Sequence, residues 1–560
     1  MTSNASRPWK NDLLEIALIF AVFCVQGAWP VPDVNEPYYL GKAIHYWNPD
    51  WVQGDFFLDS ADAHWVFYFA FGWLGLVLSP PALAWFGRVL TWGLLAWSWQ
   101  RLSWALVPRR GMAVLTGALF ACLMERCHMA GEWVIGGVEA KGFAYVLVFL
   151  GLEAMIRGRW NRAWLLFGGA SLFHVLAGGW VALAAGFSWL VLSRKRPPPD
   201  CERPPLRSMW PGLLGGLAIS LPSVIPSLAL DWGIDSQTVD QACEIYVCYR
   251  LPHHLIALQF PLLFLSRFLA MVLVWVLLCL AVAREKGTGT FCLKGEDRLR
   301  SFVVGALAIA SVGALLSFLV PLDRLLAARL LRFYWFRLAD VAVPMGVALF
   351  AALLIDRWLQ CRATFQVAPR LRWWPGSAGL GLAAVALVAA AHVGDFVVLR
   401  LQPQIPRADN KVDKLGGYAA WRDACEWIAR SESIPKDARF LTPIDAQTFK
   451  WYARRPEVVA RKDIPQDAAS IVQWWDRLRD VHGIERDDPR RFWHGSLAEL
   501  GEPRLRELGK KYRADYVLTE APGIELPETE IQPKRTVPRL PLKKLYENEG
   551  YVVYQLGEEP

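Results

Sequence analysis

The chain has 560 residues, of which 54% are hydrophobic and 20% charged, and its formal net charge is +8. A soluble domain is about 45–50% apolar, and here the excess is concentrated in residues 12–400, so the composition excludes a wholly soluble protein. Most basic residues stand in short segments beside apolar runs. The positive charge therefore indicates membrane topology, and we do not expect a nucleic-acid partner.

About eleven apolar runs in residues 1–400 predict transmembrane helices, because each is long enough, or nearly so, to cross a bilayer core about 30 Å thick. Every second connection between the runs is basic, beginning with Arg7 and Lys10 and continuing with Arg109 and Arg110. Short basic connections stay in the cytoplasm, so we expect the N-terminus inside and residues 401–560 outside. The predicted spans are roughly 12–30, 82–106, 111–126, 142–157, 161–176, 177–193, 209–228, 258–283, 300–320, 339–357 and 376–398.

The first outer loop, residues 31–81, begins with two acidic residues, Asp33 and Glu36. If Pro37 starts a helix, both carboxylates stand at its N-terminus, where negative charge is stabilised. They could act as a base or share a metal ion. The alternative is a cluster that only caps the helix and interacts with water.

Later in the same loop, the apolar stretch 65–79 would disturb the charge alternation if it crossed the membrane. We therefore expect a helix lying on the outer surface. His64, Trp65 and Trp73 suit that position, because amphipathic rings are favoured at the membrane interface.

Other outer segments carry polar residues at predicted helix ends, either as parts of a site or as ordinary interfacial groups. An arginine followed by histidines in the segment 229–257 could bind an anion, and Cys243 and Cys248 in that segment could form a disulfide. The candidate residues in these segments are Glu139, Lys141, His174, Arg250 and His253.

Residues 321–340 should lie outside or in the outer leaflet, yet they are rich in arginine. On a continuous helix Arg329, Arg332 and Arg337 share a face about 140° wide, with Asp340 on the same side. Arginines at a membrane boundary are costly unless they are paired or hold an anion. Phosphate binding and ion pairing with nearby carboxylates are the two alternatives.

Residues 401–560 lack long apolar runs and predict a small α/β domain outside the membrane. No nucleophile elbow, P-loop or dinucleotide fingerprint is present, so we expect a cap or recognition domain over the membrane part. Helices are predicted at 417–430, 467–481 and 496–510, and strands at 439–442, 514–518 and 550–556, the last as an edge or hairpin strand.

The overall arrangement resembles the GT-C superfamily of membrane glycosyltransferases. Asn35-Glu36-Pro37-Tyr38-Tyr39-Leu40 stands where that superfamily usually has Asp-Glu and an aromatic-rich helix, and Arg88 matches a familiar arginine at the start of the second span. The chain departs from the pattern by having Asn35 in place of the first acid, with Asp33 two positions earlier. It also resembles a bacterial membrane family with the same NEP-aromatic loop and a GGVEAK segment, which points to a bacterial inner membrane.

The resemblance implies an inverting sugar transfer from a polyprenyl-phosphate donor at the outer face. Asp33 or Glu36 would then serve as the general base, and a divalent cation on Asp33, Glu36 or Asp55 is allowed but not required. The leaving phosphate would be stabilised by Arg329, Arg332 and Arg337, together with Arg250 or His253. Supporting residues would be Asp55, His64, Glu139, Lys141, His174 and Asp340.

Two other classes fit the same features. A transporter or flippase of an anionic lipid could use the outer arginines to hold a headgroup, and a non-catalytic scaffold could have descended from a transferase. A transporter predicts paired helices broken by Gly or Pro in corresponding halves and polar residues near the bilayer midplane. A scaffold predicts that Asp33 and Glu36 do not converge with the arginines.

Overall fold

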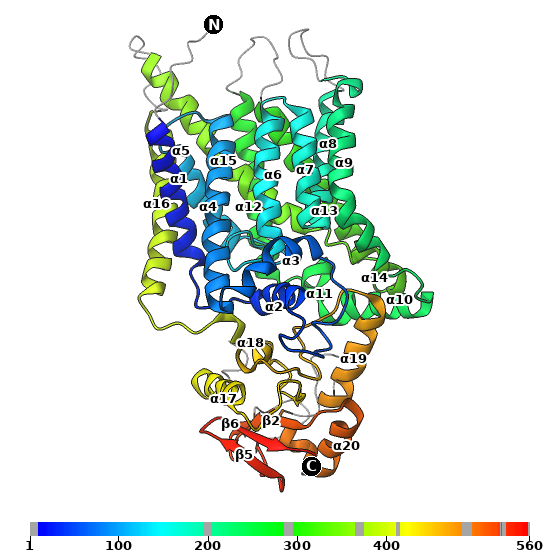
Figure 1. Ribbon diagram of the computed structural model, residues 1–560. Helices are drawn as coiled ribbons and strands as arrows, with labels where there is room; N and C mark the ends of the chain where they lie inside the picture. The colour runs from blue at the N-terminus through cyan, green and yellow to red at the C-terminus, as the bar shows by residue number, and fades with distance from the viewer. Residues whose placement is uncertain are drawn as a thin grey trace.

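Long helices form one bundle, and a smaller mixed domain lies at one end of it (Figure 1). The computed structural model describes residues 9–193, 204–284, 295–364, 375–409, 415–483, 495–526, 528 and 534–557. Each of the eleven predicted spans is a helix, with ends shifted by a few residues. They are α1 (Trp9–Gly27), α4 (Pro80–Leu106), α5 (Met112–Arg126), α6 (Ala140–Ile156), α7 (Trp160–Phe173), α8 (Val175–Ser193), α9 (Leu206–Ala229), α12 (Leu262–Arg284), α13 (Gly295–Ser317), α15 (Arg337–Thr364) and α16 (Pro375–Arg400).

Five stretches of these helices are long and apolar enough to cross a membrane: Leu206–Ala229, Leu262–Arg284, Gly295–Ser317, Arg337–Gln360 and Leu382–Arg400. The most buried of them, in α15, runs through the centre of the bundle, whereas α9, α12 and α16 expose rows of leucine and valine side chains. Such an apolar outer surface suits lipid rather than water. The protein is therefore a mostly helical integral membrane protein.

Small residues allow close helix packing inside the bundle. A Cβ atom on Gly168 of α7 would lie 2.1 Å from the carbonyl oxygen of Gly216 in α9, so the two backbones are nearly in contact. Glycine at such crossings is typical of membrane helices, where packing rather than hydrophobic burial holds helices together.

Short helices cover the end of the bundle that faces the tail (Figure 1). Pro37 lies in the first turn of α2, as predicted, and the apolar stretch 65–79 contains α3 and a 3-10 turn, also as predicted. The elements of this layer are α2 (Glu36–Trp47), α3 (Trp65–Gly72), η1 (Trp73–Leu76), α10 (Ser236–Glu244), η3 (Ile245–Arg250), α11 (Pro252–Leu255), η4 (Ala257–Gln259) and α14 (Arg324–Leu331).

The tail is a small mixed domain that begins with η6 (Arg407–Asp409). Its helices are α17 (Tyr418–Arg430), α18 (Phe449–Ala453), α19 (Ala468–His482), η8 (Leu497–Leu500) and α20 (Gly501–Tyr512). Its main sheet has the order β1-β2-β6-β5, with β1 parallel to β2 and the other pairs antiparallel. The strands are β1 (Phe440–Leu441), β2 (Tyr516–Glu520), β3 (Glu525–Leu526), β4 (Arg535–Thr536), β5 (Lys543–Glu547) and β6 (Tyr551–Gln555).

Two expectations need correction. The last strand, β6, pairs on both sides, so its prediction as a hairpin strand is confirmed and the edge alternative is wrong. The edge is β5, whose charged and mostly exposed sequence gave no strand pattern. In addition, Cys243 and Cys248 are free thiols, so the disulfide that the sequence allowed is not formed.

Candidate functional site

A cavity of about 580 Å³ lies where the bundle end meets the tail. Its walls come from α2, the segment 130–141, the start of α8, the end of α9, the elements α10 to α11, and the turn before α15. The tail segment 462–471 supplies its roof. The charged and imidazole side chains that line it are His64, Glu132, Glu139, Lys141, His174, Asp231, Arg250, His254, Arg332, Arg337 and Lys462.

Arg337 stands in the cavity wall at the start of α15. Its Nε lies 2.7 Å from Glu132 Oε2, and its Nη1 donates to His174 Nε2 at 3.1 Å. The guanidinium also stacks on the Tyr334 ring, 4.0 Å from the centroid. Tyr334 has a φ of 55°, a left-handed conformation that is rare for an aromatic residue and occurs where surrounding contacts enforce it.

Lys141 forms the second cationic point of the wall. Its ammonium lies 3.5 Å from Glu132 and 3.3 Å from Glu139, and it approaches the Trp133 ring. Glu139 also accepts hydrogen bonds from Asn35 Nδ2 at 2.9 Å and Trp133 Nε1 at 3.0 Å. Both wall carboxylates are therefore paired with cations.

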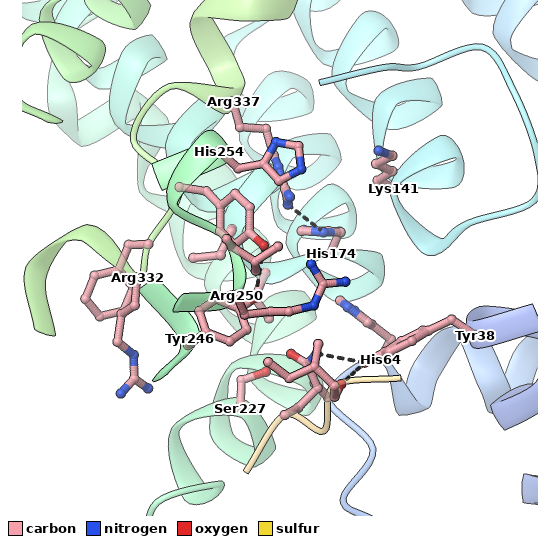
Figure 2. A pocket seen from close by; sticks show the side chains of 18 of the residues that line it. Tyr38, His64, Lys141, His174, Ser227, Tyr246, Arg250, His254, Arg332 and Arg337 are labelled. Carbon is pink, nitrogen blue, oxygen red and sulfur yellow. Dashed lines mark hydrogen bonds between the residues drawn. The ribbon is translucent and has the colours of Figure 1, made fainter. Parts of the chain in front are cut away.

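Arg250 differs from the other arginines. Its Nε donates to the carbonyl oxygen of Arg461 at 3.1 Å, and no ion pair joins it to any carboxylate of the described residues. Burial lowers the pKa of Arg250, but a guanidinium remains charged at every ordinary pH. Its side chain lines the same cavity as His174 and Arg337 (Figure 2).

The remaining predicted phosphate ligands are paired with other groups or lie outside the cavity lining. Arg332 lines the cavity but donates to Asp231 at 2.9 Å and to Cys243 Sγ at 3.2 Å, and its guanidinium points away from Arg250 in Figure 2. Arg329 pairs with Asp240 outside the lining. His253 is exposed, and the neighbouring His254 lines the cavity instead.

The expectation that three arginines share one helical face is wrong. The helix breaks between α14, which ends at Leu331, and α15, which starts at Arg337. The intervening left-handed Tyr334 reorients the chain, so Arg329 and Arg337 face different surroundings.

Asp33 and Glu36 are buried, with 1% and 0% of their surface exposed, and each forms a two-pronged ion pair. Asp33 accepts from Arg407 at 2.6 and 2.7 Å, and Glu36 accepts twice from Arg88 at 2.7 Å. Burial alone would raise the pKa of Asp33, but Arg407 holds this pKa below its usual range. Neither residue belongs to the cavity lining: both carboxylates stand behind the wall, against the backbone of Gly137 and Val138, which is what the scaffold alternative expects. A catalytic role for either stays a prediction.

The same two carboxylates hold a turn of the cavity wall. Asp33 accepts from Gly137 N at 2.9 Å and Glu36 from Val138 N at 3.0 Å. A Cβ atom on Gly137 would lie 2.8 Å from the Asp33 Cβ, so a larger residue would push the turn away. The turn leads directly into Glu139, which does line the cavity.

Asp340 and Asp55 also support structure from outside the cavity lining. Asp340, fully buried in α15, accepts from the backbone of Met129 at 2.8 Å and Ala130 at 2.9 Å, which fixes the start of the wall segment. Asp55 accepts from Leu58 N at 3.0 Å and from Glu457 N in the tail at 3.1 Å.

Asp55 belongs to a second buried group, the junction cluster of Asp55, Lys450, Glu457 and Asp463. The Lys450 ammonium contacts Glu457 and Asp463, each at 2.5 Å, and lies 3.8 Å from Asp55. The cluster leaves no room for a water-sized molecule. Burial raises the pKa of Glu457 to about 7 despite the nearby lysine, and burial likewise raises the pKa of Asp463.

The three carboxylates considered for a metal ion each have a cation partner instead, namely Arg407, Arg88 or Lys450. Within the described ranges, His, Cys, Asp and Glu side chains do not gather in threes in a way that could hold a metal ion.

The structure therefore brings together His64, Glu139, Lys141, His174, Arg250, Arg332 and Arg337 from the predicted set, and leaves the others outside the lining. Sequence reasoning missed the roof residues Lys462 and Gln466, which come from a segment without a local motif. Glu132 was noted in the same charged segment as Glu139 and Lys141 but was not chosen as a candidate site residue.

Comparisons with known proteins give limited matches. A protein family described as Domain of unknown function (DUF6798) matches residues 419–481, which lie in the tail. No curated protein matches the sequence. A similar solved structure is the archaeal oligosaccharyltransferase AglB from Archaeoglobus fulgidus in complex with an inhibitory peptide and a dolichol-phosphate. It is 12% identical, with 92% of this chain and 70% of that chain covered and a TM-score of 0.43. The function proposed below rests on this chain's own residues.

Proposed function

We propose that this chain is a membrane glycosyltransferase of the GT-C type, which takes a sugar from a polyprenyl-phosphate donor at the outer face of the membrane. The observation that carries the proposal is the cavity at the bundle end, which Arg250 lines together with Arg337 while forming no ion pair with a carboxylate of the described residues. A buried cation without a counterion is costly, and a bound anion removes that cost. Guanidinium groups match the oxygen geometry of phosphate.

The wall of the cavity also suits a lipid. Val224 and Leu228 of α9 line it together with Phe333, and Leu228 is 64% exposed. Because α9 is one of the candidate spans, this wall continues into the hydrocarbon region. A polyprenyl chain would lie along α9 while its phosphate reaches the cations inside.

The expected orientation places the cavity outside the cell. The helix ends near Arg109, Arg110 and Arg157 lie at the end of the bundle opposite the tail (Figure 1). Basic connections of this kind stay in the cytoplasm, so the tail and the cavity would face the other side. In this arrangement residues 1–400 form the membrane part and residues 401–560 the outer domain of a bacterial inner-membrane protein.

In the proposed reaction, Arg250, Arg337 and Lys141 bind the donor phosphate and stabilise the charge that develops on it as the sugar leaves. Asp33 and Glu36 act here as positioning residues, because they hold the turn at Gly137 that carries Glu139 into the wall. The tail roof would cover the bound sugar and contribute to acceptor selection.

The first test measures binding by the full-length protein in lipid nanodiscs. We expect polyprenyl phosphate to bind at least about tenfold more tightly than the uncharged polyprenol, because one charge-assisted hydrogen bond contributes about 1.5–3 kcal/mol. Equal affinity for both lipids would contradict the proposal.

The second test supplies a polyprenyl-phosphate-linked radioactive sugar together with bacterial membrane extract as the source of acceptor. Release of polyprenyl phosphate coupled to a labelled product is the expected result. Movement of the intact lipid between leaflets without cleavage of the sugar would instead identify a flippase. Binding without either outcome would identify a scaffold.

A further inference from the structure

His64 is a titratable side chain of the cavity lining whose surroundings differ from those of the other titratable groups there. It is the N-cap residue of α3, and its ring lies in the lining 5.0 Å from the His174 ring and 5.4 Å from the Tyr39 ring. The histidines come from two different connections, one before α3 and one between α7 and α8. The surface helix α3 therefore packs against the bundle where the His64 and His174 rings meet.

The carboxylates of the lining are poor candidates for a proton acceptor, because each is already paired with a cation. Glu132 pairs with Arg337 and Lys141, and Glu139 pairs with Lys141. The third carboxylate, Asp231, pairs with Arg332.

The other two imidazoles of the lining are also engaged. His174 faces the Arg337 guanidinium, which can only donate, and His254 Nδ1 lies against the carbonyl oxygen of Ala130 at 2.5 Å. The His64 ring nitrogens, in contrast, have no hydrogen-bond partner in the described part of the chain, and they are not enclosed by protein atoms. They are therefore open to the cavity.

His64 is also neutral in the empty cavity. Burial lowers the pKa of His64 to about 4, and the positive charges of Arg337 and Lys42 act in the same direction. Arg337 and Lys42 are the cations that act on it, and Lys141, Glu132 and Glu139 line the same cavity, where they form ion pairs with one another or with Arg337. A neutral imidazole with an open nitrogen can accept a proton.

We propose that His64 is the general base of this site, accepting the proton of the acceptor hydroxyl during sugar transfer. The inference rests on the transferase function proposed above. The acceptor oxygen forms a bond to the anomeric carbon, and the bond from that carbon to the donor phosphate oxygen breaks. The phosphate keeps the electron pair, and His64 takes the hydroxyl proton and later releases it to water.

The geometry also links the basicity of His64 to binding of the donor phosphate. Arg337 is both a proposed phosphate ligand and a positive charge that keeps His64 unprotonated. A phosphate bound to Arg337 offsets that charge, so the basicity of His64 rises when the donor is in place. The empty site would hold a weak base and the loaded site a competent one.

The experiment follows the modification of His64 by diethyl pyrocarbonate, which reacts with neutral imidazole, in the full-length protein in nanodiscs. Peptide mass spectrometry reads the rate at His64 as a function of pH. Without added lipid we expect a midpoint below about pH 5, and with saturating polyprenyl phosphate a midpoint higher by about one unit or more. If the bound lipid only shields His64 from the reagent, the maximum modification rate would fall but the midpoint pH would stay the same.

Two variants distinguish a role of His64 as the general base from a purely structural role. His64→Gln should lower kcat about 10²- to 10⁴-fold while polyprenyl phosphate affinity changes less than about threefold. His392→Gln is the matched control, since His392 bonds Gln26 between α1 and α16, away from the cavity, and its kcat should be unchanged.

The two hypotheses fail in different ways. If polyprenyl phosphate binds but the His64 midpoint does not move, or His64→Gln keeps full kcat, the inference on His64 is overturned and the transferase proposal stands. If polyprenyl phosphate does not bind, both are overturned.

Discussion

The cavity and the junction cluster lie at the same boundary between bundle and tail, yet they handle unbalanced charge in opposite ways. The cavity has an excess of cations and about 580 Å³ of space. The junction cluster surrounds one lysine, Lys450, with three buried carboxylates and leaves no room for a water-sized molecule. The cavity can therefore bind a ligand, whereas the junction cluster can bind only a proton.

The physical reason is the cost of isolated charge in a low-dielectric environment. Where space is available, a counterion of opposite sign can enter and remove that cost. Where space is absent, an ionisable group must shift its pKa and become neutral. The raised pKa values of Glu457 and Asp463 show this second response. Arg250 cannot neutralise itself and forms no direct ion pair among the described residues, so a bound anion would compensate its charge beyond what the nearby Asp445 carboxylate supplies.

The largest expected effect comes from removing the cation of the junction cluster. Lys450→Met leaves three buried carboxylates without their common partner, and breaking such a buried group costs about 3–5 kcal/mol. We expect the tail to undock or unfold at a much lower temperature, measured by hydrogen exchange of Asp55–Leu58 and of the tail.

The matched control for this change is Lys544→Met, because Lys544 pairs with Glu547 at the surface. Exposed pairs contribute about 0–1 kcal/mol, so this variant should behave like the parent. Similar melting of the two variants would mean that the cluster does not hold the junction.

The next effect concerns the cavity. Arg250→Met removes a charge without removing an ion pair known among the described residues, so folding should be little affected. Loss of a charge-assisted hydrogen bond should weaken polyprenyl phosphate binding about 10- to 150-fold, measured by titration in nanodiscs. Arg329→Met, outside the lining, provides the control and should bind as the parent does. Equal losses in both variants would point to general surface electrostatics.

The pH dependence of the free energy of unfolding tests whether Glu457 of the junction cluster is protonated in the folded protein. The carboxyl of Glu457 has a pKa raised from 4.5 to about 7, so between these values the folded chain holds a proton that the unfolded chain has lost. The free energy of unfolding should therefore fall as pH rises through this window, by on the order of 1–3 kcal/mol. The pKa values of His64 and His254 are lowered, so below pH 6.5 these two histidines make the free energy of unfolding rise with pH.

The measurement is therefore the difference in melting temperature between the parent and Glu457→Gln at about pH 6.5 and about pH 8. The parent should lose more stability over this interval, because the glutamine cannot ionise. Parallel curves would show that Glu457 is not the group that keeps the proton.

The membrane part was predictable because its signals are local. Run length and charge alternation identified all eleven long helices, and Pro37 marked the start of α2. The edge strand β5 was missed because its exposed, charged residues are stabilised by pairing with β6, a contact that its own sequence does not show.

The site was only partly predictable, because partners distant in sequence decide what each residue does. Asp33 pairs with Arg407, which is 374 residues away, and this pairing occupies a carboxylate that looked available for catalysis. Arg329 and Arg337 share a face only on a continuous helix, and the left-handed Tyr334 breaks that helix. Arg250, by contrast, was chosen from its polar neighbours and does line the cavity, while its binding of phosphate stays a prediction.

The smallest effect tests how the roof is attached to the cavity. Tyr38 in α2 accepts from Gln466 Nε2 at 2.7 Å and donates to the carbonyl oxygen of Ile464 at 3.3 Å, so one hydroxyl pins the roof segment. Tyr38→Phe should destabilise closure of residues 461–468 by about 0.5–1.5 kcal/mol, the net worth of a typical hydrogen bond. Faster hydrogen exchange confined to that segment is the expected result. Tyr546→Phe, which removes a hydroxyl bonded to Asp423 at the far edge of the tail, should leave that exchange unchanged. If both variants leave the roof closed, the segment is held by the apolar packing of α19 against α10, and the cavity opens only when the whole tail moves.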